Sequence, residues 1–288
     1  MSTFELIAKV IKRIRRRLED EGLDGIPEKM QEKLRYLSGG YARLHGSNSH
    51  AIDYSNGVTQ LCYVFKYVAA HADYLFKVLR RARSAAAAPL FSGKTLRVAC
   101  LGGGPGSDII GIMRYLEHHR SGEPTSQVIV DIYDKEEAWL PVLKDIVGEI
   151  TSDISLDVTF VALDVSDAST WDTADFSKYD LITASFFVSE IRRIGLGQPA
   201  KRFWKYVLGT IADGAIVAFN DNNDERIYGY FDAIAKGSGA METVASAEDE
   251  EVSCSDSFYP IERLIEKLDH RPKRNGHTAY RVIRKAEL

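Results

Sequence analysis

The sequence contains little cysteine and no long apolar run. Its cysteines, Cys62, Cys100 and Cys254, lie far apart in the chain and lack the spacing of metal ligands. No apolar stretch approaches the roughly 20 residues that a membrane-spanning helix needs, and the first residues lack the apolar core and cleavage site of a signal peptide. We therefore expect reduced thiols, no metal site, no membrane contact and a soluble, cytoplasmic protein.

The chain also lacks an excess of positive charge. It contains 37 Lys and Arg against 41 Asp and Glu, which gives a net charge of -4. This balance does not favour nucleic acid as a partner, because dedicated nucleic-acid-binding domains carry a positive field. The hydrophobic content of 45% suits one large globular domain, or one domain with an extension.

The first 90 residues are predicted to be helical. One helix starts near the N-terminus, with an apolar stripe at spacings of three and four formed by Phe4, Ile7, Ile11, Ile14 and Leu18. Its other face is basic and is either solvated, which we favour, or in contact with phosphates or an anionic membrane. This basic face comprises Lys9, Lys12, Arg13, Arg15, Arg16 and Arg17.

A second helix is expected from Pro27 to about Leu37, where Gly39 and Gly40 would end it. Residues 41–57 lack periodicity and indicate a long loop, and residues 57–83 form a third predicted helix. The tyrosines of this helix lie on a different stripe from its aliphatic residues, so the helix is expected to be covered on two sides. Simple amphipathic packing is the alternative explanation.

From about residue 91 the pattern changes to alternating strands and helices, which is typical of a βαβ protein. Strands are expected at 96–101, 128–133, 158–163, 181–184, 215–219 and 279–283. Helices are expected at 107–118, 136–150, 200–211, 225–235 and 260–268. The chain thus divides into a helical segment, 1–90, and an α/β domain, 91–288.

The strand at 96–101 runs directly into a glycine-rich turn, Gly102-Gly103-Gly104-Pro105-Gly106, and then into a helix. Such a turn presents bare backbone N–H groups to a ligand at the positive end of a helix dipole. Ser107 stands where the dinucleotide fingerprint requires Gly or Ala, which disfavours NAD. The turn also lacks the Gly-Lys-Ser/Thr ending of a phosphate-binding P-loop.

With this turn, residues 94–288 resemble the class I S-adenosylmethionine-dependent methyltransferase superfamily. The resemblance implies a Rossmann-like, mostly parallel seven-stranded sheet flanked by helices, here with an N-terminal helical extension. It implies S-adenosylmethionine as cofactor and S-adenosylhomocysteine as product, with cofactor contacts from Gly102, Gly103, Gly104, Gly106 and Ser107. Cys100 departs from the pattern, because many members have an acid there; Ser107, Asp108 or backbone carbonyls would replace that contact.

Two acids at strand ends extend the resemblance. Asp134, followed by Lys135, matches the family's acid after the second strand, which binds the ribose hydroxyls. Asp131 is the less favoured alternative, and a helix N-cap is the structural explanation for either acid. Asp164 and Val165 match the adenine-binding position after the third strand, where an ordinary turn is the alternative.

The ends of the fourth and fifth strands are expected to lie beside the methyl acceptor. Ser185 is assigned to the cofactor, whereas Phe186, Glu190 and Asn220 are assigned to the substrate. Phe186 or Phe187 would face the sulfonium, although packing is the more ordinary role for at least one of them. Glu190 is a general base or a helix-dipole acid, and Asn220 starts a polar turn that lines the pocket or simply precedes a helix.

These features predict an enzyme that transfers a methyl group from S-adenosylmethionine to an unidentified acceptor. Small molecules and proteins are favoured over RNA as acceptors, and the protein is expected to be a monomer or homodimer. Tyr54, Tyr63 and Tyr67 are predicted to lie over the cofactor and to form part of the acceptor site. A non-catalytic S-adenosylmethionine-binding sensor is the alternative, and an NAD-dependent oxidoreductase is less favoured. No dedicated base is required, because positioning supplies most of the catalysis.

Overall fold

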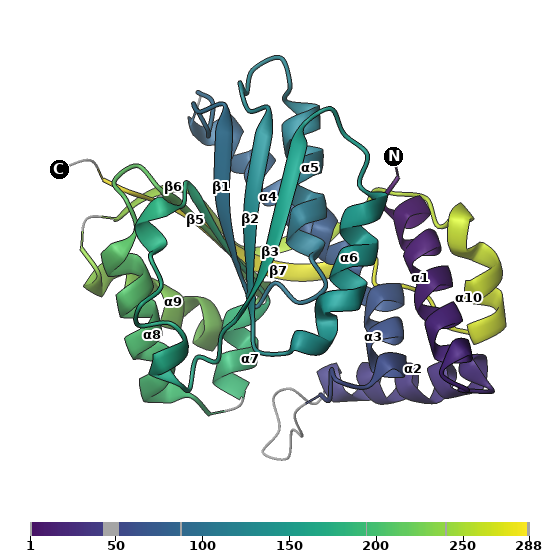
Figure 1. Ribbon diagram of the computed structural model, residues 1–288. Helices are drawn as coiled ribbons and strands as arrows, with labels where there is room; N and C mark the ends of the chain where they lie inside the picture. Colours follow the sequence, from purple (N-terminus) through teal and green to yellow (C-terminus); the bar gives the residue numbers. More distant parts are fainter. Residues whose placement is uncertain (1, 43–51, 87, 194, 240, 287–288) are drawn as a thin grey trace.

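The computed structural model of the protein describes residues 2–42, 52–86, 88–193, 195–239 and 241–286. Seven strands form one sheet in the order β3-β2-β1-β4-β5-β7-β6 (Figure 1). Strands β1 to β5 are parallel, β7 is antiparallel to β5, and β6 is antiparallel to β7. The expected Rossmann-like α/β fold is therefore confirmed. The strands are β1 (Thr95–Leu101), β2 (Gln127–Asp134), β3 (Ser155–Ala162), β4 (Leu181–Ser185), β5 (Ile216–Asn222), β6 (Met241–Ser253) and β7 (Asn275–Lys285).

Helices cover both faces of this sheet. Helices α7, α8 and α9 bury one face, and α4 and α5 pack on the other. The bounds of these helices are α4 (Ala69–Ala86), α5 (Ser107–His118), α7 (Phe187–Arg193), α8 (Gly197–Thr210) and α9 (Glu225–Gly237). Two more helices of the α/β region are α6 (Leu140–Glu149) and α10 (Glu262–Leu268). Four short 3₁₀ turns are described at Glu137–Trp139, Ala168–Thr170, Phe176–Lys178 and Tyr259–Ile261. Among the described residues, no helix is long and apolar enough to cross a membrane.

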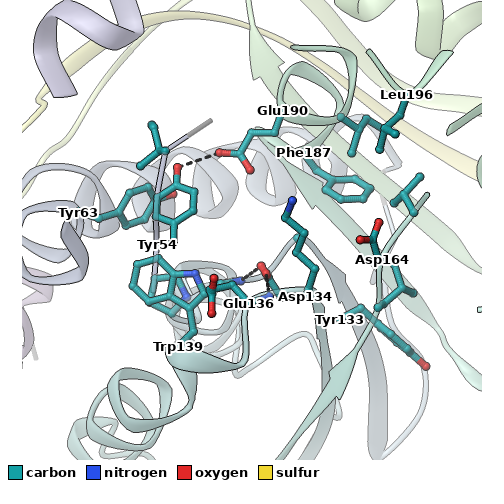
Figure 2. A pocket seen from close by; sticks show the side chains of 18 of the residues that line it. Tyr54, Tyr63, Tyr133, Asp134, Glu136, Trp139, Asp164, Phe187, Glu190 and Leu196 are labelled. Atoms are coloured by element: carbon teal, nitrogen blue, oxygen red, sulfur yellow. Dashed lines mark hydrogen bonds between the residues drawn. The ribbon is translucent and has the colours of Figure 1, made fainter. Parts of the chain in front are cut away.

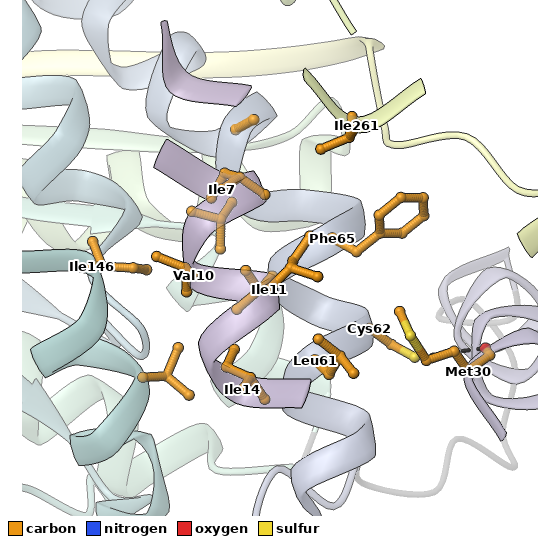
Figure 3. Close-up of a cluster of buried hydrophobic side chains, with 14 of the residues drawn as sticks. Ile7, Val10, Ile11, Ile14, Met30, Leu61, Cys62, Phe65, Ile146 and Ile261 are labelled. Atoms are coloured by element: carbon orange, nitrogen blue, oxygen red, sulfur yellow. Dashed lines mark hydrogen bonds between the residues drawn. The ribbon is translucent and has the colours of Figure 1, made fainter. Parts of the chain in front are cut away.

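The N-terminal helices α1 (Thr3–Asp20), α2 (Ile26–Ala42) and α3 (Gly57–Tyr63) build their own hydrophobic cluster, which also includes residues of α6 and α10 (Figure 3). The predicted apolar stripe of α1 is buried there. Its basic face is not simply solvated: Lys9 and Arg13 pair with Glu149 of α6, and Arg17 pairs with Asp145. Ion pairs therefore hold α1 against the α/β domain.

Two details of the N-terminal prediction change. The expectation that Gly39 and Gly40 end the second helix is wrong, because α2 continues to Ala42. Glycine weakens a helix by about 1 kcal/mol relative to alanine, but it retains both backbone hydrogen-bonding groups. Most of the expected loop at 41–57 falls on residues 43–51, which lie outside the described residues.

The predicted helix at 57–83 is present but irregular. Its α-helical parts, α3 and α4, are joined by a π-helical segment, Val64–Val68, which the sequence pattern did not indicate. A π segment accommodates an extra residue within a helix and is often found at functional sites. Here the π segment sets the direction in which Tyr63 and Tyr67 point relative to the side chains of α4.

At the C-terminal end of the chain, one strand is longer than expected and one is new. β5 continues through Asn222 and pairs with both β4 and β7, so Asn220 lies within a strand and the expected turn there is wrong. β6 was not predicted, because its sequence is rich in Ala, Glu and Ser and lacks clean alternation. It is an edge strand with register irregularities at two places, and only one side pairs with a neighbour.

Candidate cofactor pocket

A pocket of about 240 Å³ opens at the carboxyl ends of the parallel strands, with Tyr63 of α3 on one side and Leu196 on the other (Figure 2). In open α/β sheets, ligands bind at this edge, where the strand order reverses. Here β1 lies between β2 and β4, so the reversal falls beside the glycine turn. The pocket is lined by Ile52, Asp53, Tyr54, Tyr63, Gly102, Gly104, Pro105, Tyr133, Asp134, Lys135, Glu136, Trp139, Leu163, Asp164, Val165, Phe187, Glu190, Ile191 and Leu196.

The glycine turn is required both by the pocket and by packing. Gly104 lies in the pocket wall, and a Cβ on it would come within 3.5 Å of the Trp139 indole nitrogen. Gly102, with φ 63°, also lines the pocket, and a Cβ there would lie 2.4 Å from the ring of Phe187. The bare backbone therefore leaves room for a ligand at Gly104 and for an aromatic ring at Gly102.

Asp134 ends β2 at the floor of the pocket. Its carboxylate accepts hydrogen bonds from the backbone N–H groups of Gly104 and Glu136, at 2.9 Å each. Burial raises the pKa of Asp134, and these two hydrogen bonds oppose the shift. The competing Asp131 does not line the pocket and accepts hydrogen bonds from Lys178 and Tyr179 instead.

Asp164 and Val165 lie across the pocket, after β3. One oxygen of Asp164, Oδ1, accepts hydrogen bonds from the backbone N–H and the hydroxyl of Ser166 at 2.8 and 2.6 Å. Although burial acts against it, the bonds from Ser166 and the charge of Lys135 leave the pKa of Asp164 lowered. Asp164 is therefore an ionised acceptor on the opposite side of the pocket from the N-terminal helices.

An aromatic wall closes the side of the pocket next to the N-terminal helices. The ring centroids of Tyr54, Tyr63 and Trp139 lie 5.4 to 5.6 Å from one another. The hydroxyl of Tyr54 donates a hydrogen bond of 3.0 Å to Glu190 of α7, as Figure 2 shows. Tyr54 and Tyr63 thus line the pocket, and their part in an acceptor site over the cofactor stays a prediction.

Seven of the proposed site residues do not line the pocket: Gly103, Gly106, Ser107, Ser185, Tyr67, Phe186 and Asn220. Ser107 and Asn220 are buried. Phe186 has a φ of 57°, and its ring stacks on His71 of α4 at 4.1 Å, so Phe187 faces the pocket in its place. Tyr67 also packs against His71.

The residues suggested to replace an acid at Cys100 also point elsewhere. The side chain of Asp108 is buried and accepts a hydrogen bond of 2.5 Å from the hydroxyl of Thr183. Cys100 is buried in the core beneath Gly103, and burial raises the pKa of its thiol. Neither side chain lines the pocket.

Several residues that line the pocket could not be predicted from the sequence. Trp139 reaches the pocket from the turn after β2, and Leu196 reaches it from the segment before α8. Glu136 could have been predicted as a pocket residue, because it lies only two residues after Asp134 in the sequence. Leu196 and Ile191 depend on the path of α7, which the sequence did not specify.

The described lining of the pocket is acidic. It contains five carboxylic acids and one lysine, Lys135; the acids are Asp53, Asp134, Glu136, Asp164 and Glu190. A ligand with a net positive charge is favoured in such surroundings, whereas one carrying a pyrophosphate is disfavoured.

The fold matches those of solved methyltransferase structures. The carbon methyltransferase CurJ is 13% identical, with a TM-score of 0.50 over 96% of this chain and 71% of that chain. Further matches are the N-methyltransferase NodS from Bradyrhizobium japonicum in complex with S-adenosyl-L-homocysteine (11%, TM-score 0.42, 87% and 98%) and an arsenic(III) S-adenosylmethionine methyltransferase from Chlamydomonas reinhardtii (15%, 0.40, 77% and 74%). No family model and no curated protein sequence matches the chain. The chain thus has the Rossmann-like fold of class I S-adenosylmethionine-dependent methyltransferases.

Proposed function

We propose that this protein transfers a methyl group from S-adenosylmethionine to a small-molecule or protein acceptor. The observation that supports the proposal most directly is the meeting of three features in one pocket. These are a bare glycine turn at Gly104, a half-buried acid at Asp134 and a second acid at Asp164. They come from the ends of three adjacent parallel strands.

The residues present fit an adenosine bearing a sulfonium. Asp134 would accept the ribose hydroxyl hydrogens, and Asp164 would accept hydrogen from the adenine amino group. Apolar side chains between them, Leu163, Val165 and Leu196, offer a surface for a flat ring. The cofactor supplies an activated methyl group when bound, so the protein has to position the acceptor and exclude water.

The charge of the pocket separates this proposal from an NAD-dependent oxidoreductase. A dinucleotide would place two phosphate charges among the acids of the lining, whereas S-adenosylmethionine brings a positive sulfonium. Parallel calorimetric titrations with S-adenosylhomocysteine and with NAD test the difference. We expect saturable binding of S-adenosylhomocysteine only; binding of NAD alone would overturn the proposal.

Catalysis is tested separately from binding. Incubation with methyl-labelled S-adenosylmethionine and cell extract should transfer label to an acceptor in the presence of the wild-type protein, and heat-inactivated protein is the control. If S-adenosylhomocysteine binds and no label is transferred under any condition, the protein is a cofactor-binding sensor instead.

A further inference from the structure

A row of buried polar atoms without hydrogen-bond partners lies near the pocket. These atoms are Oγ of Ser185, both side-chain atoms of the Asn220 amide and Oγ1 of Thr278. Asn220 is completely buried, and Thr278 is 1% exposed. Because buried polar groups are nearly always hydrogen-bonded, this row points to a bound polar ligand or to ordered water.

The row lies on one face of the sheet. Ser185 of β4 is in register with Asn220 of β5, and Thr278 of β7 stands opposite the next-but-one residue of β5, Asn222. Side chains alternate along a strand, so all three unpartnered side chains point to the side of α4 and α5. Ser185 and Asn220 lie toward the carboxyl ends of β4 and β5, and Thr278 pairs with the last residue of β5. This is the edge where an acceptor of the proposed reaction has to approach.

A lysine without an anionic partner lies at the same edge. Lys273, in the segment before β7, places its ammonium 5.0 Å from the ring centre of Phe186 and 5.6 Å from that of Tyr74. Its ammonium makes no ion pair and no hydrogen bond with any of the described residues. Burial lowers the pKa of Lys273 to about 8.

The nearby Asp221 does not form an ion pair with Lys273. Asp221 is fully buried and accepts backbone hydrogen bonds from Ser189 and Asn222, at 2.9 and 2.7 Å. Burial raises its pKa to about 6, and the positive charge of Lys273 opposes the shift without an ion pair between the two. Lys273 therefore retains its capacity to bind an external anion.

Phe186 connects Lys273, the polar row and the cofactor pocket. Its backbone N–H donates a hydrogen bond of 2.7 Å to the carbonyl of Asn220, and its ring lies under Lys273. The next residue, Phe187, lines the cofactor pocket. A positive φ is unusual for phenylalanine, so the ring is held against His71 and Lys273 by its surroundings and not by backbone preference.

We propose that Lys273 is a specificity-determining residue that binds a carboxylate of the methyl acceptor, with Asn220 and Ser185 binding its neighbouring polar groups. The inference rests on the proposed methyl transfer and names the class of acceptor: small molecules with one carboxylate. A single lysine ammonium balances one negative charge, whereas a phosphate dianion would bring two, and the nearby carboxyl of Asp221 disfavours the second. The rings of Phe186 and Tyr74 favour an aromatic acid.

Matched acids and amides test this inference. Protein saturated with S-adenosylhomocysteine is titrated calorimetrically with 2-aminobenzoate and 2-aminobenzamide, and with 4-hydroxybenzoate and 4-hydroxybenzamide. We expect at least one acid to bind roughly tenfold or more tightly than its amide. Lys273→Met should weaken binding of that acid roughly 10- to 100-fold, the range for loss of a charged hydrogen bond.

Three controls make the outcome specific. Lys273→Arg should keep the preference for the acid, and Lys201→Met, at an exposed position of α8, should change nothing. All variants should bind S-adenosylhomocysteine as the wild type does. If that titration fails for the wild type, the proposed function fails; if it succeeds but no acid is preferred, or if Lys273→Met keeps the preference, only the carboxylate inference fails and the row holds ordered water only.

Discussion

Asp134 is the residue whose replacement tests the cofactor site most directly. Asp134→Asn keeps the shape of the side chain but removes the charge that would accept two ribose hydroxyls. We expect the affinity for S-adenosylhomocysteine to fall roughly 10- to 100-fold, because hydrogen bonds to charged groups contribute about 1.5–3 kcal/mol. Calorimetric titration measures the change.

Asp131→Asn is the matched control, because Asp131 lies on the same strand but bonds to Lys178 away from the pocket. An equal loss in both variants would contradict the assignment to Asp134. The pH dependence has a defined sign: burial raises the pKa of Asp134, so binding should decline on acidification at a higher pH than an ordinary aspartate would give.

The sequence indicated Asp134, Asp164 and the glycine turn because strand ends and turns leave local patterns. It could not indicate which neighbour of a site residue faces the pocket. Phe186 and Phe187 are chemically identical, and only the positive φ of Phe186 sends one ring to His71 and leaves the other beside Gly102. Such choices depend on tertiary packing and not on residue type.

We predict that Asn220 lowers the stability of the folded protein and contributes to binding of the methyl acceptor. Asn220→Leu removes an amide whose two polar atoms are buried without partners, so it should raise the melting temperature by roughly 2–4 °C. Methyl transfer to the acceptor should fall. Differential scanning calorimetry and the labelled-methyl assay measure the two effects.

Replacement of Asn56 by leucine is the control for the melting temperature of Asn220→Leu. Asn56 caps α3, and its side chain accepts a hydrogen bond of 3.0 Å from the backbone N–H of Thr59. Asn56→Leu should therefore lower the melting temperature. A lowered melting temperature for Asn220→Leu as well would show that the amide at position 220 is satisfied within the fold.

At the scale of elements, ion pairs hold α1 against α6. Glu149→Gln removes the partner of Lys9 and Arg13, and should lower the melting temperature by roughly 1–3 °C at pH 7, since such pairs contribute about 0.2–1 kcal/mol each. The hydrogen bond from Lys9 is the largest contribution that lowers the pKa of Glu149. Thermal unfolding at several pH values measures the difference.

The sign of the pH dependence follows from that lowered pKa. Stability from Glu149 is present above its unfolded-state pKa, about 4.3, and is lost as the pH falls through the folded-state value. The gap between wild type and Glu149→Gln should therefore close on acidification. Asp153→Asn is the control, because its partner Arg120 is exposed and no change is expected; a gap that widens in acid would contradict the assignment.

The periodicity of the sequence was sufficient for α1 and for most of the sheet, because each buries one regular face. It was insufficient for β6, whose Ala, Glu and Ser residues form an edge strand only because β7 supplies a partner. The π-helical segment at Val64–Val68 could not be predicted from the sequence for a similar reason. An extra residue in a helix is stabilised by what packs around it, and the local pattern stays helical.

At the scale of the whole molecule, the N-terminal helices and the α/β domain share their cores. A Cβ on Gly111 of α5 would lie 2.6 Å from the carbonyl of Ala72, so α4 rests directly on α5. Leu75 and Leu79 of α4 belong to the cluster that buries β1 and β2, and Val142 of α6 belongs to the cluster of the N-terminal helices. A boundary near residue 90 therefore separates sequence patterns more clearly than it separates packing units.

A chain that starts at residue 91 should consequently fail to fold on its own. Removing residues 1–90 would expose apolar side chains on both α5 and α6, and each large side chain left unburied costs about 1.5–3 kcal/mol, against a total stability of about 5–15 kcal/mol. We expect the full chain to unfold in one cooperative thermal transition by circular dichroism, and the shortened chain to show none. A cooperative transition in the shortened chain, together with binding of S-adenosylhomocysteine, would instead show that residues 91–288 are an independent domain and that the N-terminal helices serve only the acceptor.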